Sequence, residues 1–229
     1  MERKVPLIEG EYFHIYNRGV DKRKIFMDTH DYHRFMMLIY LCNSSEPVDL
    51  QKLFREGRTF TEIFSVPREK LLVDIGAWVL MPNHFHMVLK GKQKNGITLF
   101  LRKLCTGYST YINLKYERSG SLFQGKFKSK HASDDRFLKY LFSYVHLNPI
   151  KLISGESNWK EVGLKNKVFA EKFINNYEYS SLPDYRGQDR IYNTIINKDL
   201  FLDIHDDFNE MIKNMEDWLQ ESDNKKIFS

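Results

Sequence analysis

The order of hydrophobic and polar positions along the chain predicts alternating strands and helices. A strand places successive side chains on opposite faces, whereas a helix brings together residues three or four positions apart. On these criteria we expect, in chain order, a strand at 12–17, a helix at 31–43, a hairpin at 73–90, a helix at 98–116, a short strand at 126–131 and a helix between Ser133 and Pro149. The order β-α-β-β-α-β, with one helix added, is that of the ferredoxin-like split βαβ fold. We therefore predict an α+β domain with an antiparallel sheet and helices on one face.

Two segments lie outside this order. Residues 44–72 hold Pro47 and Pro67 around a short helical pattern and are expected to form an insertion. Beyond residue 152 the character changes, and residues 199–229 carry nine acidic and three basic side chains with apolar residues at helical spacing. We therefore predict a first domain at 1–152 and a mostly helical C-terminal annex at 153–229.

The hairpin contains a pair of histidines, His84 and His86, directly after the turn signal Pro82-Asn83. Residues two apart in a strand share a face, so these imidazoles could bind one divalent metal ion. The alternative is ordinary alternation, in which the histidines face solvent while Phe85 and its apolar neighbours pack inward. Two histidines are an incomplete metal site, so a further ligand is needed from elsewhere.

The helix between Ser133 and Pro149 offers the missing chemistry. Its apolar stripe predicts an amphipathic helix, and Tyr140, Tyr144 and Asn148 follow one another at a spacing of four on a second face. A phenol can act as a nucleophile, and an amide oxygen can complete a metal site. The alternative is that these tyrosines only flank the core, which we favour for Tyr140.

Four segments together resemble the REP-associated tyrosine transposases, which belong to the HUH single-tyrosine transposases. They are 12–20 (YFHIYNRGV), 80–86 (LMPNHFH), 120–129 (GSLFQGKFKS) and 144–151 (YVHLNPIK), with a weaker likeness at 177–185 (YEYSSLPDY). The resemblance covers roughly residues 10–152, and the joint occurrence of the motifs in this order is more specific than any one of them.

The resemblance implies a palm-type domain that cleaves and rejoins single-stranded DNA through a 5′-phosphotyrosine intermediate. It implies His84 and His86 as ligands of Mg²⁺ or Mn²⁺, Asn148 as the third ligand and Tyr144 as the nucleophile, with Tyr140 as the next candidate. Hairpin or palindromic DNA is the implied partner. The resemblance and the short link at 130–134 favour a monomer over a dimer that exchanges the tyrosine helix.

The charge distribution agrees with a DNA-binding surface. The net charge of +5 is modest, but residues 90–130 hold ten basic side chains and one acidic side chain, interleaved with aromatic residues. Basic groups neutralise backbone phosphates, and aromatic rings stack on bases. The candidate DNA contacts are Arg18, Lys115, Arg118, Lys126, Lys128 and Lys130. The alternative for 99–114 is a solvated helix face with its aromatic residues in the core.

His14 is a possible neighbour of the active site. It shares a face of the first strand with Tyr16, and in a ferredoxin-like sheet this strand lies beside the hairpin strand that carries His84 and His86. The alternative is a hydrogen-bonded histidine within the sheet.

Other sequence features narrow the class of protein. Cys42 and Cys105 lack partner spacing and are expected to be reduced core residues. Because we find neither a signal peptide nor a membrane-spanning stretch, we expect a cytoplasmic protein without a membrane partner.

Alternative functions and roles stay open at the level of sequence. A non-catalytic ssDNA- or RNA-binding module of the same fold would need no metal pair, and a nuclease with a water nucleophile would usually use carboxylate ligands. The acidic annex either caps the palm domain or competes with DNA for the basic surface.

Overall fold

Four antiparallel strands form the sheet on which the predicted site is built. The computed structural model describes residues 6–47, 49–201 and 207–220. The strands are β1 (Tyr12–Arg18), β2 (Val73–Met81), β3 (His84–Gly91) and β4 (Lys128–His131), in the order β2-β3-β1-β4. All neighbouring pairs are antiparallel, and β1 lies between β3 and β4. The predicted α+β class and the antiparallel sheet are confirmed.

Alternate residues of the central strands divide the core into two layers. Phe13 and Ile15 of β1 and Phe85 and Met87 of β3 pack in one hydrophobic cluster, whereas Val88 of β3 belongs to a second cluster on the opposite face. This separation follows from the strand period of two. Phe85 and its apolar neighbours pack inward, as the ordinary-alternation alternative stated, but His86 on the other face is buried and does not face solvent.

Helices α1 (Thr29–Cys42) and α4 (Gly96–Lys115) cover the face that Phe85 packs on. Asp28 caps α1 by accepting a hydrogen bond from the Asp31 backbone N–H, and the buried Asp31 carboxylate accepts one from the Asp28 backbone N–H. Lys115, at the end of α4, places its ammonium 2.7 Å from a carboxylate oxygen of each aspartate. This ion pair links the end of α4 to the start of α1.

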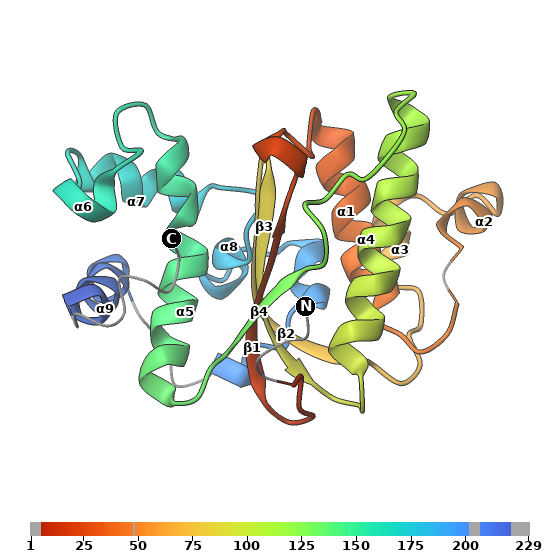
Figure 1. Ribbon diagram of the computed structural model, residues 1–229, viewed down its shortest axis with the longest axis horizontal. Helices are drawn as coiled ribbons and strands as arrows, with labels where there is room; N and C mark the ends of the chain where they lie inside the picture. Colours follow the sequence, from red (N-terminus) through yellow and green to blue (C-terminus); the bar gives the residue numbers. More distant parts are fainter. Residues whose placement is uncertain (1–5, 48, 202–206, 221–229) are drawn as a thin grey trace.

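Helix α5 (Asp135–Leu147) lies on the other side of the sheet from α1 and α4 (Figure 1). It begins where the Asp134 carboxylate accepts a hydrogen bond from the Phe137 N–H at 2.8 Å. Its buried residues join Ala77, Val79 and Val88 in the second cluster. The expectation that the helices lie on one face is therefore wrong: α1 and α4 follow it, but the added helix has its own apolar stripe and covers the opposite face.

The remaining elements are short and surround this framework. They are the 3₁₀ segment η1 (Val20–Lys22), α2 (Leu50–Arg55), α3 (Phe60–Ile63), η2 (Asn148–Leu152), α6 (Trp159–Val162), α7 (Lys167–Asn175), α8 (Leu182–Tyr185), η3 (Ile191–Ile195), η4 (Lys198–Phe201) and the longer α9 (Phe208–Gln220). Among the described ranges, no helix has the length and apolar character required to cross a bilayer.

The chain after residue 152 packs on both layers of the core. Tyr192 and Ile195 join the cluster under α1, whereas Met211 and Met215 of α9 pack in the cluster that holds α5. This packing is what the structural-cap alternative predicts for α9. The acidic positions at 203, 206, 221 and 223 lie outside the described residues.

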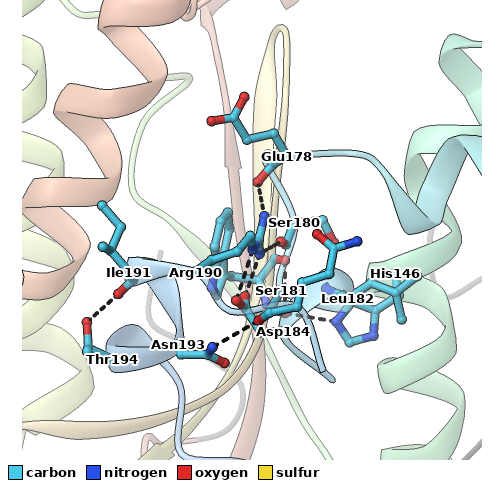
Figure 2. Close-up of polar contacts among 12 residues, drawn as sticks. His146, Glu178, Ser180, Ser181, Leu182, Asp184, Arg190, Ile191, Asn193 and Thr194 are labelled. Atoms are coloured by element: carbon cyan, nitrogen blue, oxygen red, sulfur yellow. Dashed lines mark hydrogen bonds and ion pairs between the residues drawn. The ribbon is translucent and has the colours of Figure 1, made fainter. Parts of the chain in front are cut away.

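A buried polar network fixes this segment to the sheet edge and to α5 (Figure 2). The Ser181 hydroxyl lies 2.8 Å from His146 Nε2 and accepts a hydrogen bond from the Trp78 backbone N–H of β2 at 2.9 Å. Arg190 forms an ion pair with the buried Asp184 carboxylate and donates to the Ser180 carbonyl at 2.7 Å. Buried polar groups are costly unless paired, so this network holds the segment in a fixed place.

Candidate active site

The site begins with a pair of histidines from adjacent strands. Tyr16 lies opposite His86 in the β1–β3 register, which brings the imidazole of His14 beside that of His86. His14 Nε2 lies 2.9 Å from His86 Nδ1, and the rings are stacked with centroids 5.0 Å apart. His14 thus lies beside a hairpin histidine, as the strand order predicted, and its role in an active site stays a prediction.

His84 completes the group at the start of β3. Its ring centroid lies 5.0 Å from that of His86, and the ring planes are nearly perpendicular. His84 Nδ1 lies 2.6 Å from the side-chain oxygen of Asn83 in the turn. Each hairpin histidine thus has its Nδ1 engaged by another side chain, which leaves Nε2 as the nitrogen suited to bind a metal ion.

The three histidines are held in the neutral state. Burial, followed by the charges of Lys151 and Arg18, lowers the pKa of His84 to about 4. Burial also lowers the pKa of His14 to about 3, with the charges of Lys130 and Lys160 acting in the same direction. The pKa of His86 is lowered well below its ordinary value, mainly by burial. Neutral imidazole is the form that binds metal ions, so the pair His84 and His86 fits this role chemically.

Tyr144 projects from α5 onto the histidines. Its ring is edge-on to His86 at a centroid distance of 5.3 Å and to His14 at 5.5 Å. Burial raises the pKa of the Tyr144 phenol, and a hydrogen bond with the Asn148 side chain opposes that shift. The Asn148 side chain is buried and also donates to the Tyr144 carbonyl at 3.3 Å. One chain therefore brings together the candidate nucleophile, the candidate amide ligand and the histidines.

Tyr140 has surroundings of a different kind. Its ring stacks on Phe137 and is almost completely buried, and burial raises the pKa of its phenol strongly. Its ring also lies 5.8 Å from that of Tyr144, centroid to centroid. This environment agrees with the core role that the sequence favoured for Tyr140.

Among the described residues, no acidic side chain joins the histidines to form a metal-binding cluster. Within residues 6–47, 49–201 and 207–220, no three or more His, Cys, Asp or Glu side chains form a cluster able to hold a metal ion. A metal bound at His84 and His86 would need a ligand of another type, and Asn148 is an amide of that kind.

The loop that follows α4 is tied to the end of β1. The Gln124 N–H donates to the Arg18 carbonyl at 2.8 Å, and the Arg18 side chain donates to the Gln124 side chain. Asn17 donates to the Gly125 carbonyl at 3.3 Å. Next to this junction lies an open groove of about 520 Å³ whose lining includes Phe123, Lys126 and Phe127.

The predicted DNA contacts fall into two groups. Lys126 and Lys128 are exposed, and Lys130 is half-buried on β4 near His14. Arg118 is half-buried beyond the end of α4. Lys115 differs, because its ammonium is paired with Asp28 and Asp31 and hydrogen bonds to them raise its pKa. This ion pair joins α4 to α1, and a count of charges along the sequence cannot reveal partners more than 80 residues away. The role of Lys115 as a DNA contact stays a prediction.

Sequence reasoning missed two basic residues near the site, Lys151 and Lys160. The Lys160 Nζ lies 4.1 Å from the centroid of the Tyr144 ring. Lys151 is close enough for its charge to lower the pKa of His84, His86 and Lys160. Lys151 ends the motif at 144–151 and was visible there, whereas nothing in the spacing around Lys160 pointed to the site.

Comparisons with known proteins assign the chain to a family. Residues 13–148 match the model of the family described as "Transposase IS200 like", a span that contains all three histidines, Tyr144 and Asn148. A solved structure of a REP-associated tyrosine transposase bound to a REP hairpin is similar over 83% of this chain and 89% of that one, with 15% sequence identity and a TM-score of 0.49. A search of curated proteins finds no match. By the family match over more than half of its length, the chain belongs to the IS200-like transposases.

Proposed function

We propose that this transposase cleaves and rejoins single-stranded DNA through a covalent phosphotyrosine intermediate at Tyr144. The observation that supports this most strongly is the approach of the Tyr144 ring to within 5.3 Å of His86 and 5.5 Å of His14 in a single chain. A nucleophile and a metal-binding pair must act on the same phosphate, so they must meet at one place. The short link at 130–134 favours a monomer whose site is complete within one chain.

The residues fit a divalent ion, Mg²⁺ or Mn²⁺, held by His84, His86 and Asn148. Both imidazoles are neutral and engaged through Nδ1, and the amide stands one helical turn after the nucleophile. When bound, such an ion supplies Lewis-acid stabilisation to a non-bridging phosphate oxygen. His14 acts as a positioning residue, because its contact with His86 Nδ1 fixes the ring orientation.

The chain's own residues perform the transfer. Lys126, Lys128 and Lys130 attract the DNA backbone, and Arg18 lies at the end of β1 beside the loop. The Tyr144 phenol oxygen attacks the phosphorus, and the bond from phosphorus to the 3′ oxygen breaks. The phenol proton is released, the leaving 3′ oxygen takes up a proton, and a 5′-phosphotyrosine remains. A second 3′-OH reverses these steps on a new DNA end without ATP.

We further propose that hairpin-bearing DNA is the substrate. The proposal rests on the resemblance of the four sequence segments to REP-associated transposases. The loop at 120–127, which carries one of these segments, lies between the basic strand β4 and the end of β1, where DNA would approach.

A non-catalytic ssDNA- or RNA-binding module is the second candidate. The observation that favours it is the burial of Tyr144, which is 7% exposed and whose pKa is raised, because a protonated and enclosed phenol is a poor nucleophile. Such a module would bind nucleic acid through the basic surface without cleaving it.

One experiment separates these functions. The protein is incubated with a mixture of labelled single-stranded hairpin DNAs and Mn²⁺ or Mg²⁺, and denaturing gels are scored for a protein–DNA adduct. A metal-dependent, denaturation-resistant adduct supports the transposase mechanism. Tight binding of the DNA without an adduct in the presence of either ion supports the binding module. Cleavage of the DNA without an adduct supports a nuclease with a water nucleophile.

A further inference from the structure

Lys160 is brought to the nucleophile by a segment that lies outside the matched family span. It is the second residue of the short helix α6 (Trp159–Val162), and its ammonium lies over the Tyr144 ring, 4.1 Å from the centroid. Residues 13–148 contain the histidines and Tyr144 but end before α6. The surroundings of Tyr144 therefore include the Lys160 ammonium, which comes from the C-terminal segment.

The position of Lys160 is fixed by packing around it. The neighbouring Trp159 side chain is buried in the cluster that contains α5. The buried Glu156 carboxylate accepts hydrogen bonds from the backbone N–H groups of Lys165, at 3.0 Å, and Asn166, at 3.3 Å. These contacts close the loop around α6 at both ends. A long basic side chain held this way loses less conformational entropy when it binds a ligand.

The charge around Lys160 suits an anion. The charge of Lys151 lowers the pKa of Lys160 and of both hairpin histidines. The charge of Lys130 lowers the pKa of His14, and that of Arg18 lowers the pKa of His84. Within the described residues, neither Lys151 nor Lys160 forms an ion pair with a carboxylate. Glu161 alone opposes the lowering of the Lys160 pKa to about 7, which burial dominates. Lys151 and Lys160 lie close together without an acidic partner among the described residues, which is costly, and a bound phosphate would offset that cost.

A purely structural role for Lys160 would explain its contact with the Tyr144 ring, but not why a charged side chain lies close to other basic residues. A lysine over an aromatic face gains a cation–π attraction, which is of modest size. An apolar side chain could fill the same space without placing an ammonium among other cations. The phosphodiester that Tyr144 attacks is the anion that must come within bonding distance of the phenol oxygen, and therefore close to Lys160.

We propose that Lys160 is a catalytic residue that binds the scissile phosphate beside Tyr144, so that the C-terminal segment completes the active site. The inference rests on the proposed function, because it takes the Tyr144 phosphodiester as the ligand. The ammonium contacts a non-bridging oxygen of the phosphate. It stabilises the negative charge that develops on this oxygen while the bond between phosphorus and the leaving 3′ oxygen breaks. The adjacent phosphate favours the charged form of Lys160, so the ammonium keeps its proton throughout the step.

The test compares Lys160→Met, Lys160→Arg and the matched control Lys167→Met, which removes an exposed charge from the same segment. A fluorescent single-stranded hairpin DNA with Mn²⁺ is used to measure the dissociation constant and the single-turnover rate of adduct formation at saturating DNA. We expect Lys160→Met to lower the rate by about 10- to 100-fold, with a dissociation constant changed by less than about threefold. Lys160→Arg should recover most of the rate, and Lys167→Met should match wild type.

Two results would overturn the proposal. One is a Lys160→Met rate within twofold of wild type. The other is an equal loss in the Met and Arg variants together with a lower melting temperature, which would assign Lys160 to packing.

A second readout separates this inference from the proposed function. Reductive methylation of lysines, mapped by mass spectrometry, is measured with and without the same hairpin DNA in the Tyr144→Phe protein. Protection of Lys160, with Lys167 unprotected, supports the phosphate contact even if wild type forms no adduct. Equal modification of Lys160 with and without bound DNA contradicts it, whether or not the adduct forms.

Discussion

His14 Nε2 lies 2.9 Å from His86 Nδ1, so the first strand sets the ring orientation of a histidine in the hairpin. If His86 binds a metal ion through Nε2, its Nδ1 carries the proton and donates to His14. Such contacts commonly change metal affinity by about 10- to 100-fold when they are removed. His14 is therefore a positioning residue whose effect should be visible in the metal dependence.

We predict that His14→Leu raises the Mn²⁺ concentration needed for half-maximal adduct formation by about tenfold or more. His14→Gln, which keeps an acceptor, should raise it less. The measurement is a Mn²⁺ titration of adduct yield with saturating hairpin DNA. Identical titration midpoints for wild type and His14→Leu would show that the contact with His86 does not support metal binding.

We predict that His84→Ala or His86→Ala abolishes metal-dependent cleavage while DNA affinity is largely kept. Loss of a ligand removes activation of the phosphate but leaves the basic surface in place. Asn148→Ala should be milder, because water can replace a neutral amide ligand. Cleavage assays at millimolar Mg²⁺ or Mn²⁺, paired with binding measurements, test this. Wild-type cleavage in either histidine variant would place the metal site elsewhere.

We predict that replacing Lys126, Lys128 and Lys130 together with Ala weakens binding to single-stranded DNA and flattens its salt dependence. Fewer counterions are released when fewer phosphates are neutralised, so the slope of log affinity against log salt becomes smaller. Ala replacements at the exposed Lys52, Arg55 and Arg58 in the insertion remove the same charge and should leave the slope unchanged. Equal slopes for all three proteins would assign the β4 lysines to a solvated face.

We predict that His146 makes the folded state less stable in acid. Burial lowers the pKa of His146 to about 3, while the unfolded chain has the ordinary value near 6.5. As the pH falls below about 6.5, the unfolded state takes up this proton first, so the free energy of unfolding decreases by up to about 1.4 kcal/mol per pH unit. Urea unfolding of wild type and His146→Gln between pH 7 and pH 4.5 should show a shallower pH dependence in the variant. Parallel curves would contradict this account of His146.

The sequence predicted the parts of the site that depend on local periodicity. His84 and His86 share a face because a strand has a period of two, and Tyr144 and Asn148 lie together because a helix turns in just under four residues. The neighbouring strand that carries His14 followed from the order of elements. These residues lie where the pattern predicted them, although their chemical roles remain proposals.

The parts that the sequence did not predict depend on contacts between distant segments. The apolar stripe of α5 shows that the helix is buried, but not which face of the sheet it covers. The ion pairs of Lys115 with Asp28 and Asp31 join residues more than 80 positions apart, so a count of local charges does not show them. Lys160 comes from a segment whose path is fixed by Trp159 and Glu156, and no regular spacing links it to Tyr144.

The central claim is that the Tyr144 hydroxyl forms the covalent bond to DNA. Tyr144→Phe removes one oxygen and keeps the ring that packs against His14 and His86, so it should cost no more than about 1 kcal/mol of stability. Tyr140→Phe is the matched control on the same helix.

The most direct measurement is the adduct with labelled hairpin DNA and Mn²⁺, resolved on denaturing gels, with the modified peptide identified by mass spectrometry. The account predicts an adduct on the peptide that contains Tyr144 in wild type and in Tyr140→Phe, and none in Tyr144→Phe. An adduct of wild-type yield in Tyr144→Phe, or a nucleotide attached to Tyr140, would contradict it.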